Sequence, residues 1–195
     1  MSVSRTLSLF ALAGVLWSAS LTAQSSKSSK SSAPETFSAN AQATNSNLGL
    51  SAVVGIHIER YTPDREREAM AEELRLGGYP AFLTALRKAP NVGYVELGGK
   101  KFVVRWAREQ PAGQGRTIVV VTDQPVFFVG GGSVTEKPRA GYELAVLRLD
   151  VDAVGLGTGT MAAAARVKPG GPTGVQVDDY GSEPLKLVTV RKSFK

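Results

Sequence analysis

"GLGTGTMAAAARV", residues 155–167, decides between two folds for this chain. Gly157, Gly159 and Ala162 match G-x-G-x-x-A, the phosphate-binding turn of a dinucleotide-binding fold. Asp178 follows about 20 residues later, where a ribose-binding carboxylate would belong. The competing interpretation is two antiparallel strands with a glycine-rich joint.

Three features favour the antiparallel interpretation. The strand before the glycines alternates, with Leu147, Leu149 and Val151 separated by charged residues, whereas a parallel strand covered by helices on both faces is continuously apolar. A phosphate turn needs a following helix, and a parallel crossover needs a dozen or more residues. Residues 160–167 are too few, because "KPGGPTG" follows them. We therefore predict a strand here, with the alanines at 162–165 allowing close packing under a helix, and no nucleotide or other cofactor site.

The segment before it contains the clearest hairpin. Residues 98–99 are both glycine and separate two alternating runs, which predicts a type I′ turn. The resulting register sets Val95 opposite Phe102 on an apolar face. It sets Glu96 opposite Lys101 on the other face, where the charges are complementary. Turn, packing and charge therefore predict the same pairing.

The remaining runs complete a mostly β chain. Residues 116–124 are apolar on both faces, which predicts a central strand. Four further strand-like runs, separated by Gly-rich or Pro-rich turns, span residues 142–153, 160–167, 174–180 and 184–192.

Two helices are predicted after a first strand at 51–61. The first covers residues 64–76, with Thr62 as its cap, and ends at the glycines 77–78; the second covers 80–88. The predicted fold class is α+β: a mostly antiparallel β-sheet, sandwich-like or an open barrel, with a pair of helices inserted after the first strand.

The N-terminus has the pattern of a secretory signal peptide over residues 1–23: Arg5, an apolar run over 7–17, and small residues before Ala23. A retained membrane anchor is the alternative, but the second half of the uncharged stretch is polar. Residues 24–47 are rich in Ser, Asn and Ala and predict a flexible leader, although Phe37 could dock a short strand.

We expect residues 48–195 to form a single globular α+β domain. The predicted location is periplasmic or secreted, with no membrane span after cleavage. The chain has no cysteine, so disulfides and a lipid anchor on cysteine are excluded.

The positive charge of the chain has two interpretations: it keeps an exported domain soluble, or it attracts anionic partners. The formal net charge is +6 and the pI is about 9.7. For an exported protein we expect an anionic envelope polymer or another envelope protein, and no nucleic acid. With one histidine and no cysteine, the usual zinc, copper and haem ligand sets are missing, and no metal site is predicted.

Carboxylates are the remaining candidates for chemistry. Paired carboxylates can bind Ca²⁺ or act as acid and base in glycoside hydrolysis, but Asp also makes tight turns. The candidates for an acidic site are Asp150, Asp152, Asp178, Asp179 and Glu183.

A second candidate is an anion-binding surface on the hairpin. Tyr94, Lys101 and Arg105 share its polar face, whereas Trp106 is predicted on its apolar face. These patterns favour a non-enzymatic binding or structural domain in a bacterial envelope. The alternatives are a secreted hydrolase using paired carboxylates, and a module that adds a strand to a partner sheet.

Overall fold

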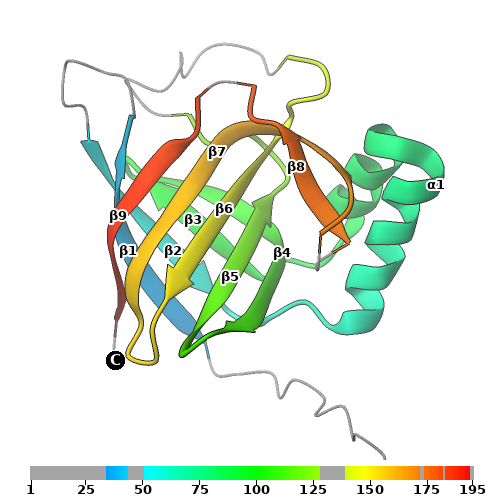
Figure 1. Ribbon diagram of the computed structural model, residues 1–195. Helices are drawn as coiled ribbons and strands as arrows, with labels where there is room; N and C mark the ends of the chain where they lie inside the picture. The colour runs from blue at the N-terminus through cyan, green and yellow to red at the C-terminus, as the bar shows by residue number, and fades with distance from the viewer. Residues whose placement is uncertain (1–33, 44–50, 128–138, 172–173, 182, 194–195) are drawn as a thin grey trace, which may run out of the picture. The chain divides into compact units, whose positions relative to one another are not determined.

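The computed structural model describes residues 34–43, 51–127, 139–171, 174–181 and 183–193. The predicted signal peptide and its membrane-anchor alternative lie outside these residues. Within them the chain forms one helix, α1 (Asp64–Lys88), and nine strands (Figure 1). The strands are β1 (Glu35–Gln42), β2 (Ser51–Ile58), β3 (Gly93–Leu97), β4 (Lys100–Ala112), β5 (Gly115–Thr122), β6 (Leu144–Val151), β7 (Leu156–Pro169), β8 (Val175–Asp179) and β9 (Leu185–Ser193).

Eight of these strands close into an antiparallel barrel. The order is β6-β5-β4-β3-β2-β1-β9-β7, and β6 also pairs with β7, which completes the ring. β8 pairs with the end of β7, outside the ring. The antiparallel pairing is as predicted, but the predicted α+β fold, a sandwich-like sheet or an open barrel with a pair of helices, is wrong. Closure depends on pairing between distant segments, such as β1 with β9, which local alternation does not specify.

The first strand lies within the range predicted as a flexible leader. In β1, Phe37, Ala39 and Ala41 are buried in the barrel core, while the residues between them are partly exposed. The folded part therefore starts before residue 48. The suggestion that Phe37 docks a short strand is confirmed, whereas the composition of the segment gives no indication of it because its other inward side chains are small.

The predicted helix pair is one helix with a kink. The backbone angles of Gly78, φ 68 and ψ −167, are not helical and interrupt the helix. Pro80 follows in the first turn after this interruption, where proline is well tolerated. The prediction of Thr62 as the cap is also wrong. Its amide donates to the Ala107 carbonyl at 2.8 Å, and its Oγ1 accepts from the Ala107 amide at 3.0 Å. Thr62 thus fixes the start of α1 to β4.

α1 packs on the outside of the barrel. Leu74, Phe82 and Leu86 share a buried cluster with Ala162 and Ala165 of β7, so the prediction of close packing at these alanines is confirmed. Trp106 belongs to this outer cluster and not to the barrel interior. A register shift between Val104 and Trp106 turns its side chain toward the helix.

The quoted segment is β7, paired antiparallel with β6 as predicted. Gly159 faces Leu149, and a Cβ added to Gly159 would lie 2.2 Å from the Arg148 carbonyl oxygen. The glycines therefore permit close strand approach. The hairpin register is confirmed as well, with Val95 opposite Phe102.

Candidate functional site

The barrel interior is filled by side chains. An eight-stranded barrel has room either for its own side chains or for one small ligand. Here the described inward side chains are apolar and nearly all buried, so we looked for functional groups at the barrel ends and on the outer wall. The largest contributors are Phe37, Ile56, Ile58, Ile118, Leu147, Leu149, Met161 and Leu187.

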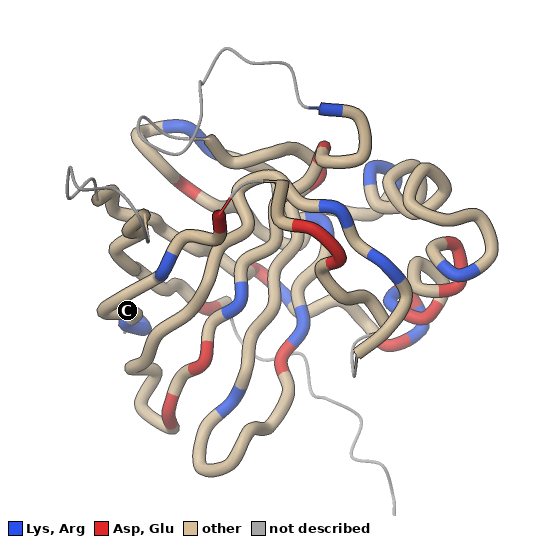
Figure 2. Tube along the Cα trace, turned by 45° about the horizontal axis from the view of Figure 1, so that its top comes forward, with Lys and Arg blue, Asp and Glu red and all other residues tan. Residues whose placement is uncertain are grey.

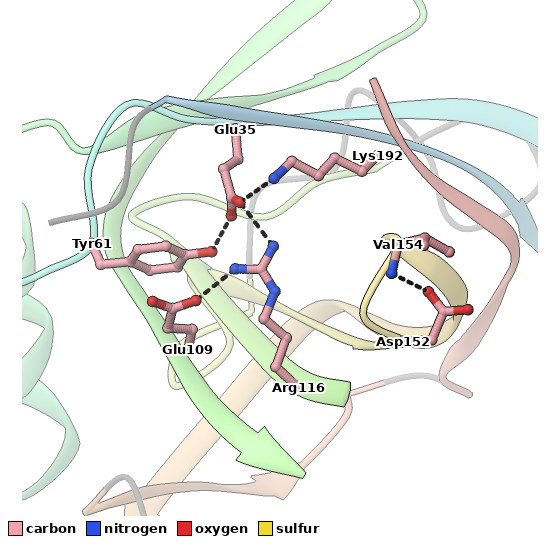
Figure 3. A network of polar contacts seen from close by, with 7 residues as sticks. All are labelled: Glu35, Tyr61, Glu109, Arg116, Asp152, Val154 and Lys192. Carbon is pink, nitrogen blue, oxygen red and sulfur yellow. Dashed lines mark hydrogen bonds and ion pairs between the residues drawn. The ribbon is translucent and has the colours of Figure 1, made fainter. Parts of the chain in front are cut away.

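A network of charged side chains closes one end of the barrel (Figure 3). The carboxylate of Glu35, at the start of β1, is 6% exposed. It accepts hydrogen bonds from Tyr61 Oη at 2.7 Å, Arg116 Nη2 at 2.8 Å and Lys192 Nζ at 2.6 Å. Arg116 also donates to Glu109 at 2.6 Å. The network joins β1, β4, β5 and β9, and its two carboxylates balance its two cations.

The electrostatics of the network hold Glu35, Tyr61 and Arg116 in their ordinary charge states. Burial alone would raise the pKa of Glu35, but the hydrogen bonds from Arg116, Lys192 and Tyr61 outweigh it and lower the pKa below 4.5. Burial and the Glu35 carboxylate raise the pKa of Tyr61. Burial opposes the charge of Arg116, but its two carboxylate partners raise its pKa overall. Because a general acid or base needs a pKa near the working pH, these shifts favour a structural role for the three groups.

Replacing Glu35 by Gln is expected to lower the free energy of unfolding by about 2 kcal/mol, because Arg116 and Lys192 lose their charged partner. Breaking a fully buried pair costs about 3–5 kcal/mol. The partners here are 23% and 28% exposed, which reduces the effect. Chemical denaturation measures the change. Glu109→Gln, which removes one hydrogen bond to a more exposed carboxylate, should cost about 1 kcal/mol or less.

Comparing the wild type with Glu35→Gln also tests the pH dependence of the stability. The folded-state pKa of Glu35 is lower than its ordinary value of 4.5, so its contribution is fully present above pH 4.5. It is lost as the pH falls through the folded-state pKa. The stability difference between wild type and Glu35→Gln should therefore shrink below pH 4.5. A difference that is constant down to pH 3 would contradict the assigned ion pairs.

The structure places Asp150 and Asp152 in different settings. Asp150 lies on the outer wall of β6, where its carboxylate accepts from Thr117 at 2.5 Å and from Arg148. Burial raises the pKa of Asp150, but these hydrogen bonds outweigh it and lower the pKa overall. Asp152 follows β6 in a turn and accepts from the amides of Val154 at 3.0 Å (Figure 3) and Leu156 at 2.9 Å. Asp152 thus stabilises the β6–β7 turn.

The other acidic candidates lie on or after β8. Asp178 pairs with Lys168 at 3.0 Å, and this partner lowers its pKa. Asp179 accepts from Tyr142, which lowers its pKa as well. These contacts tie β8 to the barrel. Glu183 is exposed and lies between β8 and β9.

The anion-surface candidates are divided between two places. Lys101 Nζ lies 4.3 Å from the Tyr94 ring centroid, and His57 stacks on the same ring at 4.2 Å. Arg105 is engaged elsewhere. Its Nε donates to Asp123 at 2.7 Å and its Nη1 to the carbonyl of Ala89 at 3.0 Å, which ties the end of α1 to β4.

A groove on the outer wall lies between the barrel and β8. Its volume is about 420 Å³, within the range of ligand sites of about 300–1,000 Å³. Its lining residues come from β4, β5, β6 and β7, and from β8 with the residues on either side of it. Its lining combines apolar and polar side chains and includes Val119, Val146, Arg148, Thr160, Val177 and Tyr180.

Comparisons with known proteins give no match: no family model, curated protein or solved structure resembles the chain significantly. Over the described residues, no three His, Asp or Glu side chains gather as metal ligands. The one helix in that part of the chain lacks the apolar length needed to cross a membrane.

Sequence reasoning missed the network around Glu35 and the groove around Arg148. A signal for Glu35 exists, because it begins an alternating stretch in which Phe37, Ala39 and Ala41 recur at every second position. The sequence shows Arg148 only as one cation on a strand. Its place in the groove depends on the register that sets it beside Val119 and Thr160.

Proposed function

We propose that this chain is a non-enzymatic binding domain of a bacterial envelope that holds an anionic polymer on the outer wall of its barrel. The observation that carries this proposal is the position of the groove beside β8. The barrel interior is filled, whereas the groove offers about 420 Å³ with Arg148 and the partly exposed Tyr180 in its lining. A cation and an aromatic ring beside hydroxyl and amide groups suit a polar anionic ligand.

The charge distribution supports an anionic ligand. The full chain carries a net charge of +6. Figure 2 shows Lys and Arg positions interspersed with Asp and Glu positions over the strands and the helix. The excess of the full chain adds long-range attraction for an anionic polymer.

Export is the second part of the proposal. It rests on the N-terminal pattern of residues 1–23, with cleavage after Ala23, and places the mature domain in the periplasm or outside the cell. The envelope polymers of bacteria are then the anionic polymers within reach. The strand-adding module is less well supported, because β8 is the edge strand of the described sheet and has only five residues.

A single-cysteine label tests the proposed binding site. The chain has no cysteine, so Thr160→Cys gives one attachment point for an environment-sensitive fluorophore in the groove lining. Val53→Cys, on the exposed outer face of β2, is the matched control. Adding polymer extracted from a bacterial envelope should change the emission at position 160 and leave position 53 unchanged. No response at position 160, or equal responses at both positions, would contradict binding in the groove.

A further inference from the structure

Strand register places three cations in one line across the outer wall. Arg108 of β4 pairs with Val119 of β5, and Val119 pairs with Arg148 of β6. Arg148 pairs with Thr160 of β7, and Thr160 pairs with Lys186 of β9. We call these five positions the cation row. It runs perpendicular to the strands, and its centre forms part of the groove lining.

The spacing of the row is set by the sheet. Neighbouring strands lie about 4.8 Å apart, so the backbone positions of cations on every second strand are about 10 Å apart. The row from Arg108 to Lys186 therefore spans about 20 Å along the wall. The outward side chains of its cations diverge, because the row crosses five of the eight strands of a closed ring. Between the cations stand Val119 and Thr160, which are uncharged.

Arg148 is held in place at the middle of the row. Its Nε and Nη2 donate to the carboxylate of Asp150, whose other partner is Thr117. An arginine has five N–H donors, so Nη1 remains for a second anion. The Arg148 side chain is 57% exposed, which leaves it accessible from the groove. Asp150 both orients Arg148 and offsets part of its charge.

The two ends of the row also carry positive charge. Lys186 is exposed on β9. Arg108 lies near a second guanidinium, that of Arg67, and near Asp64 at the start of α1. Burial and the charge of Arg67 lower the pKa of Arg108.

The surroundings of the row are uncharged hydrogen-bonding groups and one ring. Gln110, Thr117 and Gln176 line the groove together with the Tyr180 ring, which is 38% exposed. Amides and hydroxyls bond to hydroxyl groups, and an aromatic ring packs on the apolar face of a sugar. Double-stranded nucleic acid carries one charge per about 1.7 Å, far more densely than the row does.

From these observations we infer that the ligand is a linear acidic polysaccharide in which uncharged sugar units separate the charged ones. It would lie across β4 to β9 along the cation row, with one carboxylate at Arg148 and the next at Lys186. This inference rests on the proposed function and specifies its ligand.

Titration with defined glycans tests the inference in the mature protein. The probe is hyaluronan oligosaccharide, which alternates a uronate with a neutral sugar; dextran is the uncharged control, and polyphosphate is the densely charged control. We expect hyaluronan to bind more tightly than polyphosphate, with no binding of dextran. Removing a charge-assisted hydrogen bond with Arg148→Gln should weaken hyaluronan binding about tenfold. Lys186→Gln should weaken it about threefold, because an exposed lysine contributes less.

Two further variants separate this site from general attraction. Asp150→Asn should tighten hyaluronan binding, because it removes the carboxylate that competes for Arg148. Lys100→Gln, at the exposed β3–β4 turn and off the row, should leave binding unchanged. Thermal unfolding of every variant identifies any loss of fold. Tighter hyaluronan binding by Asp150→Asn cannot be explained by a loss of stability.

Three outcomes would overturn the inference. They are no binding of hyaluronan, equal losses with Arg148→Gln and Lys100→Gln, and tighter binding of polyphosphate than of hyaluronan. If the label at position 160 responds to envelope polymer while hyaluronan does not bind, the proposed function stands and the polysaccharide class assigned here is wrong.

Discussion

A chain that begins at residue 48 is expected not to fold, whereas a chain that begins at residue 31 is expected to keep the barrel. The shorter chain lacks β1, so β2 and β9 lose their shared neighbour and the ring opens. The core also loses Phe37, Ala39 and Ala41. Replacing one buried Phe by Ala costs about 3–5 kcal/mol, and a whole domain is stable by about 5–15 kcal/mol. Removal of the entire strand therefore exceeds the available stability.

Circular dichroism and thermal unfolding of the two chains measure this effect. The longer chain should unfold in one cooperative transition, and the shorter chain should show none. In the full chain, Phe37→Ala should lower the free energy of unfolding by about 3–5 kcal/mol, whereas the partly exposed neighbour Ser38→Ala should change it by less than about 0.5 kcal/mol. If the chain starting at residue 48 unfolds cooperatively at the temperature of the longer chain, β1 is dispensable and the closed ring is wrong.

Replacing Gly159 by Ala is expected to destabilise the protein by about 3 kcal/mol, the upper range for inserting a methyl group into a tightly packed region. The new Cβ would lie 2.2 Å from the carbonyl oxygen of Arg148 and 3.2 Å from Leu149 Cδ2. The closer obstacle is backbone, which moves only if the β6–β7 pairing shifts. Since this pairing completes the ring, the strain acts on the closure of the barrel.

The matched control is Thr158→Ala. Thr158 is exposed and directly precedes Gly159 in the same strand, so its loss should change the stability by less than about 0.5 kcal/mol. Urea denaturation measures both variants. Equal stabilities for Gly159→Ala and Thr158→Ala would show that the two strands are not as closely apposed as described.

Local patterns predicted those parts of the fold in which several signals agree. The hairpin from β3 to β4 was predicted in its correct register because turn residues, alternation and opposite charges specify the same pairing. The β7 strand was predicted against the helix propensity of its alanines, because the alternation of β6 and the short run before "KPGG" outweigh that propensity. At Arg105 the alternation fails, since a register shift there places Trp106 on the outer wall.

The closed ring and the candidate sites required information that local patterns lack. Glu35 meets Arg116 across 81 residues, and a segment rich in small polar residues gives no indication of that pairing. The cation row is invisible in the sequence, because Arg108, Arg148 and Lys186 come into line only through four strand pairings. The kink in α1 was not predicted for another reason. Two glycines predict the end of a helix, but Pro80 is compatible with a helix that starts again directly after them.

The pairing of β1 with β9 has a consequence for how the protein is made. The ion pair between Glu35 and Lys192 joins positions 157 residues apart, so the ring cannot be completed until β9 has been synthesised and has left the ribosome. Contacts of such high sequence separation slow folding, because a long loop must be ordered before they form. In a nascent chain, the edges of β1 and β7 that pair with β9 therefore stay open until β9 emerges.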